Sequence, residues 1–285
     1  AVPGPRVLVS GPVGMTAGHG DLFTPPPHYD RRPPRVADSP DECRKLVRTW
    51  ARSGVDGIKI YTSGGVLSMG DKVGWRNQTP AGDLGDRGRG PCTRNARGCP
   101  HPLGGGVDIA LEFGVDSIEH GTGILPRHFD ALLERDLPVA PTLLINDVIA
   151  QRRVPVGDEA AAKARAVVAD RDVNFAAAAA AGIRFVLGSD ANGVFVRFGD
   201  QMEELRLMQR MFGWTAERTL RSGTSDAADA MRLGSTTGRL VEGGLDADFI
   251  VVRGRPWNDI DALTAENVVA VVARGGEVVA GSLPA

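Results

Sequence analysis

The order of local sequence patterns constrains the fold of this chain more than any other feature. From about residue 40, helical patterns alternate with short β-branched runs that end in polar or glycine residues, which is typical of parallel βα units. Ser39 begins the first unit, because its side chain can cap a helix whose acidic residues Asp41 and Glu42 face the helix dipole. The pattern predicts a helix from there to Gly54, followed by a strand over residues 57–61.

The same alternation continues along the chain. Further helices are predicted over residues 107–114, 126–136 and about 158–181. Further strands are predicted over residues 5–11, 116–120, 137–144 and 183–190. Polar residues stand at or just after the carboxyl end of the strands, where barrel enzymes build their active sites. The predicted fold class is therefore α/β, with a TIM-type (β/α) barrel.

The last part of the chain follows another pattern. From residue 239, short strands are joined by Gly and Asp turns, which predicts a small antiparallel β appendage over residues 239–285. Residues 1–238 are predicted to form the barrel domain. A length of 285 residues suits one barrel with a small appendage better than two equal domains.

One segment, residues 80–105, breaks the alternation. Gly, Arg and Pro make up more than half of residues 80–106, so the segment cannot bury enough apolar area to offset its ordering entropy. We expect an irregular, disordered or loosely held loop. Cys92, Cys99 and His101 within it do not match a structural zinc knuckle, because the spacing of the cysteines is wrong and a fourth ligand is missing.

Composition narrows the class of partner and the compartment. A net charge of −2 gives no reason to expect nucleic acid or an anionic membrane as a partner. The sequence starts without a basic-then-apolar run, and no apolar stretch approaches the length of a membrane span. We therefore expect a cytoplasmic protein, with its cysteines reduced.

Three residues at predicted strand positions are candidates for chemistry. Lys59 lies between two isoleucines, so its ammonium needs a partner, such as Glu119, or a modification, unless it extends to the barrel mouth. His120 ends another strand, although a single histidine is often a satisfied structural residue. Asp190 ends a third, where it could instead cap the next helix. Together they form the set expected of a metal site at a barrel mouth.

Other polar residues have weaker claims. His19 and Tyr61 follow predicted strands on the active side, so they either line the mouth or are ordinary loop residues. His28 and His128 are expected at the surface, on a loop and a helix. The glycines of residues 62–65 could cradle a phosphate, although such glycine pairs are also common turn residues.

The chain resembles the amidohydrolase superfamily, in particular its imidazolonepropionase-like and Xaa-Pro-dipeptidase-like branch. The resemblance covers residues 1–79 and 106–285 and is carried by the strings VDGIKIYTSGG, GVDSIEHGTGI, VAPTL, AGIRFVLGSDA and ADAMRLGSTTGRLVEGGLDADFIVVRGRPWNDIDAL. It implies hydrolysis of amide bonds, often in cyclic amides or dipeptides, with one or two divalent metals, commonly zinc.

The resemblance also implies a role for each candidate. Lys59 corresponds to the strand-four lysine, which in binuclear members is carbamylated and bridges the metals. His120 corresponds to the strand-six histidine ligand. Asp190 corresponds to the strand-eight aspartate, which binds metal and takes a proton from the attacking water. Such a metal lowers the pKa of the water, and the carboxylate passes the proton to the leaving nitrogen.

Some family ligands have no counterpart in this sequence. The family's His-x-His pair on strand one is absent, and the first predicted strand resembles the family's third, so we expect an N-terminally truncated, incomplete barrel. The strand-five ligand would fall within residues 80–105, where His101 is a candidate. The composition there leads to the hypothesis that this segment is a frameshifted translation. Two possibilities follow: an active metal-dependent hydrolase of small-molecule amides or dipeptides, or an inactive or weakly active remnant that binds ligands. An incomplete barrel would also favour self-association.

Overall fold

The computed structural model describes residues 6–15, 18–19, 36–75, 77, 104–273 and 275–284. Most of the predicted irregular segment, residues 80–105, lies outside these ranges. The same holds for the predictions about His28, Cys92, Cys99 and His101.

The described strands of the main body pair in parallel, as the sequence predicts. β1 (Ser10–Val13) pairs with β2 (Gly57–Ile60), in a register that sets Pro12 opposite Lys59. β3 (Ile118–Glu119) pairs in the same way with β4 (Val139–Ala140). These pairs are two separate sheets within the described ranges. Two isolated parallel bridges add to them, one between Gly14 and Val36 and one between Val139 and Phe185.

Four strand predictions need correction. The strand predicted over residues 116–120 is reduced to β3 (Ile118–Glu119). β1 begins at Ser10, later than the predicted strand over residues 5–11. Residues 183–190 contribute the bridge at Phe185 and no longer strand. The strand predicted over residues 137–144 stops at Ala140, because Pro141 cannot donate to a strand ladder and Thr142 takes a left-handed conformation with φ of 46°. Its last two residues, 143 and 144, begin a helix instead.

The first helix, α1 (Pro40–Arg52), begins where the sequence predicts and ends two residues before the predicted stop at Gly54. The Ser39 side chain accepts a hydrogen bond from the Glu42 backbone at its start. The helix packs on β1, and the indole of Trp50 donates to the Pro12 carbonyl at 2.9 Å. Gly11 is required for this approach, because a Cβ at that position would lie 2.3 Å from Cγ of Trp50.

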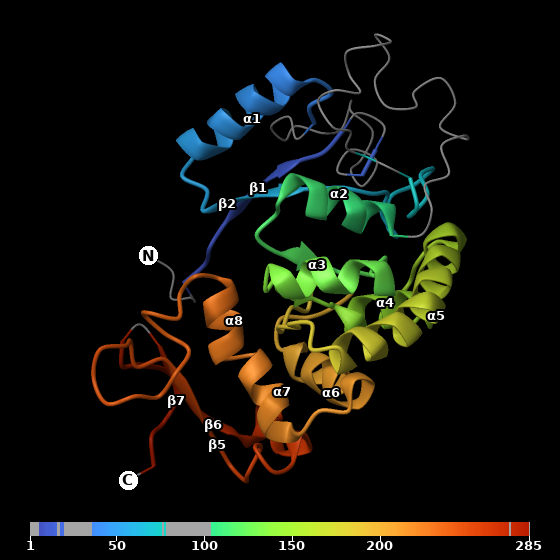
Figure 1. Cartoon of the computed structure of the whole chain (residues 1–285). Helices are drawn as coiled ribbons and strands as arrows, with labels where there is room; N and C mark the ends of the chain where they lie inside the picture. Colours follow the sequence, from blue (N-terminus) through green and yellow to red (C-terminus); the bar gives the residue numbers. More distant parts are fainter. Residues whose placement is uncertain are drawn as a thin grey trace.

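The remaining helices follow the parallel strands and surround the main core (Figure 1). They are α2 (Gly105–Phe113), η2 (Pro126–His128), α3 (Phe129–Glu134), α4 (Leu143–Ala150), α5 (Asp158–Ala180), α6 (Gln201–Phe212), α7 (Ala216–Ser222) and α8 (Ser225–Ala230). No helix in the described ranges is long and apolar enough to cross a membrane.

A chain of aromatic rings occupies the centre of the main core. Phe175 of α5, Phe185, Phe212 of α6 and Trp214 follow one another with ring centroids 5.2, 4.5 and 4.8 Å apart. Phe175 and Phe185 are fully buried. This cluster holds α5 and α6 against the segment that leads to Asp190, and aromatic contacts of this kind are among the largest contributors to core stability.

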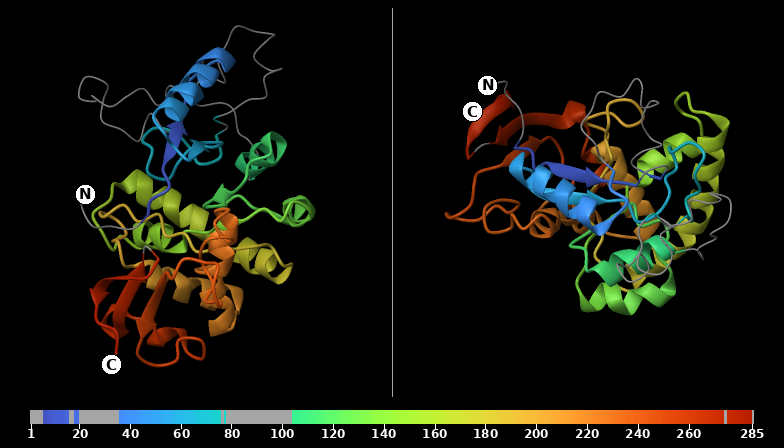
Figure 2. Two further views of the ribbon diagram at one scale, coloured as in Figure 1. Left: turned by 90° about the vertical axis from the view of Figure 1, so that its left-hand side faces the viewer. Right: turned by 90° about the horizontal axis from the view of Figure 1, so that it is seen from above.

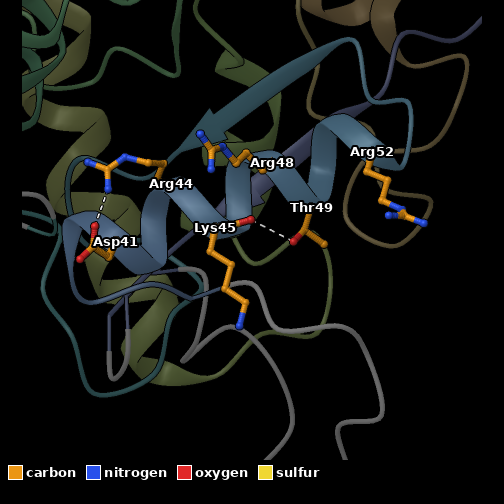
Figure 3. A pocket seen from close by; sticks show the side chains of 6 residues that line it. All are labelled: Asp41, Arg44, Lys45, Arg48, Thr49 and Arg52. Carbon is orange, nitrogen blue, oxygen red and sulfur yellow. Dashed lines mark hydrogen bonds and ion pairs between the residues drawn. The ribbon is translucent and has the colours of Figure 1, made fainter.

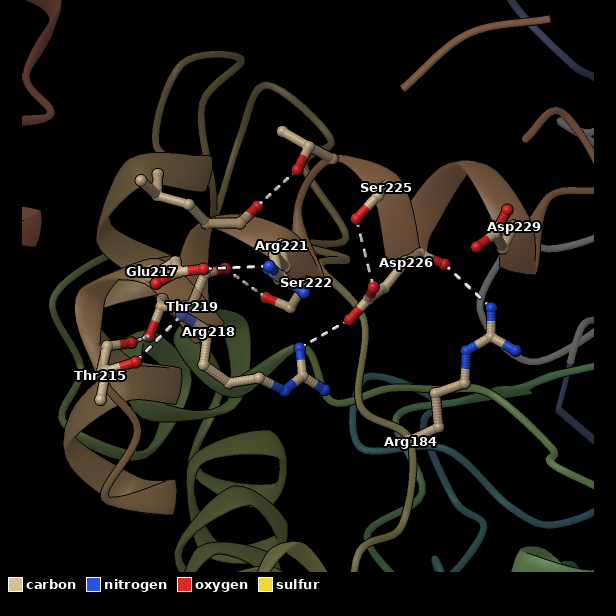
Figure 4. A network of polar contacts seen from close by, with 12 residues as sticks. Arg184, Thr215, Glu217, Arg218, Thr219, Arg221, Ser222, Ser225, Asp226 and Asp229 are labelled. Atoms are coloured by element: carbon tan, nitrogen blue, oxygen red, sulfur yellow. Dashed lines mark hydrogen bonds and ion pairs between the residues drawn. The ribbon is translucent and has the colours of Figure 1, made fainter. Parts of the chain in front are cut away.

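Polar contacts around α7 and α8 fix the same segment from its other side (Figure 4). Arg184 donates to the backbone carbonyl of Asp226 at 3.1 Å, and Arg218 donates to the Asp226 carboxylate at 2.6 Å. Leu187 donates its backbone N–H to the Ser222 carbonyl at 2.9 Å. The approach to Asp190 is thus bonded to the end of α7.

The C-terminal residues form the antiparallel sheet that the sequence predicts. Its strands are β5 (Phe249–Val252), β6 (Val268–Ala273) and β7 (Glu277–Gly281), in the order β5-β6-β7. Two short 3-10 helices, η3 (Ile260–Ala262) and η4 (Ala265–Asn267), lie between β5 and β6.

This sheet lies at the opposite end of the molecule from α1 (Figures 1 and 2). Ile260 and Leu263 nevertheless pack into the main core, and Arg206 of α6 donates to the Leu263 carbonyl at 2.6 Å. Arg6 forms ion pairs with Asp246 and Asp248. A boundary between residues 238 and 239 therefore stays a prediction, since side chains from both parts share one core.

Candidate active site at the ends of the parallel strands

Three neighbouring parallel segments end at one edge of the molecule. The His120 backbone N–H donates to the Ala140 carbonyl, Val139 donates to the Arg184 carbonyl and Val186 donates to the Val139 carbonyl, each at 2.9 Å. Because parallel segments share their carboxyl edge, the residues that follow them lie on the same side. These residues are His120, Thr142 and Asp190.

The backbone at this edge adopts an uncommon conformation at all three positions. The φ angles are 67° at His120, 46° at Thr142 and 51° at Asp190. Non-glycine residues are uncommon in this left-handed region, and a β-branched residue such as threonine is an outlier there. Strained residues of this kind persist only where surrounding contacts impose them, and they concentrate at functional sites.

Lys59 reaches the same site from β2. It is half-buried and forms no ion pair with any residue that the structure describes. Burial lowers the pKa of the Lys59 amine, while the longer-range attraction of Glu119 and Asp190 partly raises it again. The direct Lys59–Glu119 ion pair considered from the sequence is therefore wrong. The amine also lies 5.8 Å from the ring centre of Tyr61.

His120 is held as a neutral imidazole. Burial, together with the positive charges of Lys59 and His19, lowers the pKa of His120 to about 3. Its Nδ1 lies 2.7 Å from Oγ1 of Thr142. Nε2 is therefore the nitrogen that remains for another ligand.

Asp190 lies at the open end of its segment. Its side chain is exposed, yet neighbouring protein atoms still desolvate the carboxyl group and raise the pKa of Asp190, against the attraction of Lys59. The alternative role as a helix cap is wrong, because α6 begins only at Gln201 with Asp200 at its N-cap position.

His19 and Tyr61 also lie beside these residues. Their ring centres are 4.5 Å apart, and His19 Nδ1 lies 3.3 Å from the Ser63 carbonyl oxygen. Burial lowers the pKa of His19, while the Asp71 carboxylate raises it. Electrostatic coupling of His19 to Lys59 and His120 joins it to the same cluster.

The glycine pair after β2 does not offer a phosphate cradle. The backbone N–H of Gly64 donates to the Trp75 carbonyl at 2.9 Å, and that of Gly65 donates to the Asp71 carboxylate at 3.0 Å. Both amides already have acceptors within the chain, so the anion-binding alternative finds no support in these contacts.

His128 is buried, with 2% exposure, which contradicts the surface position predicted from the sequence. Its Nε2 lies 2.9 Å from the Asp108 carboxylate, and its Nδ1 accepts from the Leu125 backbone at 3.0 Å. His128 is therefore a satisfied structural residue that ties α2 to η2.

Other residues at this edge were missed from the sequence. Thr142 is one, and Glu204 of α6 is another, since its fully buried carboxylate accepts from the backbone N–H groups of Leu143 and Leu144 at 2.7 Å each. Burial raises the pKa of Glu204 to about 7, more than these bonds and Arg171 lower it. The only sequence signal for Thr142 was the string VAPTL that contains it, and this string favours a strand.

The donors present fit a divalent metal in kind but are few in number. A neutral imidazole and a carboxylate are ordinary zinc ligands, and a carbamylated Lys59 would add a carboxylate-like oxygen. Within the described ranges, no group of three or more His, Cys, Asp or Glu side chains could hold a metal ion. A site with three protein ligands thus depends on Lys59.

A hollow on the outer face of α1 has a different character (Figure 3). Asp41, Arg44, Lys45, Arg48, Thr49 and Arg52 line it, and all are exposed. Arg44 pairs with Asp41, whereas the side chains of Lys45, Arg48 and Arg52 extend away from the helix. Hydrated charges such as these interact weakly, so this hollow is a solvated helix face and not a reaction site.

Several known proteins are similar to this chain. Ochratoxinase of Aspergillus niger is 27% identical over 300 residues, which cover 98% of this chain and 61% of the ochratoxinase. The chain thus spans less than two thirds of the length of this relative. A solved Xaa-Pro dipeptidase with methionine bound in its active site matches with a TM-score of 0.80 and 27% identity, over 98% of this chain and 69% of that protein.

Two further solved structures are similar to this chain over almost its whole length. The structure of A. niger ochratoxinase matches with a TM-score of 0.78 and 25% identity, over 98% of this chain and 67% of that one. A prolidase in complex with N-methylphosphonate-L-proline matches with a TM-score of 0.80 and 26% identity, over 99% of this chain and 71% of that one. The fold is accordingly of the TIM-barrel α/β type. Residues 103–279, more than half of the chain, match the model of the amidohydrolase family, and the chain belongs to that family.

Proposed function

We propose that this chain hydrolyses amide bonds of small molecules, such as dipeptides or cyclic amides, with a divalent metal held by Lys59, His120 and Asp190. One observation carries the proposal. The charge of Lys59 acts on both His120 and Asp190, which follow separate parallel segments at one edge and stand on strained backbone. The similarity to an ochratoxinase, a Xaa-Pro dipeptidase and a prolidase supports an amide bond as the target.

Lys59 would enter the site as a carbamate. A lowered pKa increases the fraction of neutral amine, and only the neutral amine attacks carbon dioxide. The nitrogen forms a bond to the carbon, one C–O π bond opens onto oxygen, and the nitrogen releases a proton. The product carries a negative charge where a desolvated cation stood, which removes the unpaired ammonium.

His120 and Asp190 would complete the ligand set. His120 offers the lone pair of Nε2, because Nδ1 faces Thr142. When bound, a divalent cation such as zinc lowers the pKa of a water molecule and polarises the scissile carbonyl. The Asp190 carboxylate would accept a proton from water and pass it to the leaving nitrogen, and burial, which raises its pKa, makes it a better proton acceptor than an ordinary aspartate.

A second candidate function is ligand binding without catalysis. None of the five histidines in the sequence is spaced as His-x-His, and the described residues contain no group of three ordinary metal ligands. A chain that had lost its metals would keep the same edge as a binding surface.

Metal analysis of the purified protein separates these two functions. The chain should carry about one or two zinc ions, and it should release amino acids from a panel of dipeptides that includes Xaa-Pro sequences. Chelation should stop the release and added zinc should restore it. A protein that takes up no zinc, and hydrolyses nothing when zinc is supplied, would support the binding function instead.

A further inference from the structure

The contact between His120 and Thr142 joins two adjacent strand ends. Oγ1 of Thr142, just after β4, lies 2.7 Å from Nδ1 of His120, just after β3. Both residues have positive φ. An extended backbone at either position would direct the side chain elsewhere, so this hydrogen bond depends on two uncommon conformations that occur together.

A buried carboxylate maintains the conformation of Thr142. Glu204 accepts from the N–H groups of Leu143 and Leu144, the two residues that follow Thr142, at 2.7 Å each. A left-handed residue before a helix leaves the first amides of that helix without a cap of their own, and no side-chain cap is present at Thr142. The acceptor comes from α6, more than fifty residues further along the chain.

Contacts on the carbonyl side reinforce this arrangement. Arg171, 1% exposed, donates to the Leu143 carbonyl at 3.2 Å and to the Asp147 carboxylate at 2.8 Å. Leu143 is therefore bonded through both its N–H and its carbonyl, to α6 and α5 respectively. A buried network that is satisfied in this way fixes the backbone on which Thr142 stands.

We propose that Thr142 is a positioning residue for His120: it accepts the Nδ1–H of the imidazole, so that the lone pair on Nε2 faces the site, while Glu204 holds Thr142 in place. Ligand histidines commonly donate their second nitrogen to a neighbouring acceptor, which fixes the tautomer and the ring orientation. The use of Nε2 rests on the proposed function, whereas the hydrogen bond and the tautomer are properties of the metal-free chain.

Two substitutions separate the hydroxyl from the shape of the side chain. Thr142→Val keeps the branched shape and removes the acceptor oxygen. Thr142→Ser keeps the oxygen and removes a methyl group. A purely structural role would make the valine variant resemble the wild type more than the serine variant does, and a positioning role predicts the reverse.

The direct test is 15N NMR of histidine-labelled, metal-free protein near neutral pH, with the His120 signal assigned from a His120→Gln variant. The wild type and Thr142→Ser should show a His120 ring protonated at Nδ1, and Thr142→Val should shift it towards the Nε2-protonated form. An unchanged tautomer in Thr142→Val would overturn the proposal. So would a wild-type ring protonated at Nε2.

Glu204→Gln provides a second variant if Thr142→Val does not fold. In the wild type each carboxylate oxygen of Glu204 accepts from one of these two amides. Glutamine replaces one of the two oxygens with an NH2 group, which can only donate, so one amide loses its acceptor and the His120 signal should broaden or shift in the same direction. A His120 signal identical to that of the wild type would remove Glu204 from the proposal.

Zinc affinity gives a further readout. Thr142→Val should bind zinc about 10- to 100-fold more weakly than the wild type, and Thr142→Ser should stay within a few-fold of it. Equal affinity in all three proteins contradicts the positioning role. If the wild type binds no zinc, the proposed function fails, while the tautomer measurement still decides the role of Thr142.

Discussion

Gly188 packs against Ala140 so closely that a Cβ built on Gly188 would lie 2.7 Å from the Ala140 Cβ. Ala140 cannot rotate its methyl group out of the way, so the two segments would have to separate. We predict that Gly188→Ala lowers the free energy of unfolding by about 1–3 kcal/mol, as overpacking of a core contact does. It should also displace Asp190, two residues later. Urea denaturation measures the first effect.

Gly157→Ala is the matched control for this substitution. A Cβ at Gly157 meets nothing within 4 Å, and φ is −66°. This variant should lose less stability than Gly188→Ala, because alanine at the N-cap of α5 is a poorer cap than glycine but meets no neighbouring atom. Equal stability of the Gly188 and Gly157 variants would mean that the segments do not pack as described.

The burial of Glu204 predicts a specific dependence of stability on pH. Its pKa is about 7 in the folded protein and about 4.5 in the unfolded chain. The folded state therefore binds the proton more tightly, so this contribution to stability is complete below pH 4.5 and is lost as the pH rises towards 7. The loss amounts to about 3 kcal/mol.

Denaturation of the wild type and Glu204→Gln at a series of pH values isolates this contribution, because other titrating groups cancel in the difference. The stability advantage of the wild type over the variant should shrink from pH 4.5 to pH 7. A difference that stays constant or grows over this range would show that the pKa of Glu204 is not raised.

A substitution of Lys59 should affect stability and function in different ways. Lys59→Met removes a desolvated amine that has no ion-pair partner among the described residues, so the metal-free protein should be at least as stable as the wild type. Zinc binding and amide hydrolysis should fall by about 100-fold or more. Lys45→Met on the exposed face of α1 should change neither. A Lys59→Met protein that keeps full zinc affinity would exclude Lys59 as a ligand.

Much of the architecture follows from local sequence patterns. Ser39 and the acidic residues after it predict the start of α1, and the alanine-rich run predicts α5, because capping and helix propensity act within a few residues. The same patterns predict the antiparallel C-terminal sheet. Family membership is also confirmed, since it depends on strings that survive in order along the chain.

The details of the candidate site depend on contacts between distant residues, which local patterns do not encode. Leu143 and Leu144 resemble the end of a strand, yet they begin α4, and their backbone N–H groups donate to the carboxylate of Glu204, about 60 residues away. The contact of His120 with Thr142 therefore cannot be predicted without the position of α6. The predicted surface position of His128 was wrong for the same reason. Its partner Asp108 lies on α2, about twenty residues earlier in the chain.

The assignment of Lys59, His120 and Asp190 as ligands stays a prediction that one measurement tests most directly. Crystals of the protein grown with zinc should show an anomalous zinc peak about 2.0–2.2 Å from Nε2 of His120 and from a carboxylate oxygen of Asp190, with the modified Lys59 as the third ligand. An ordered edge without a zinc peak, or a peak held by other residues, would contradict the account.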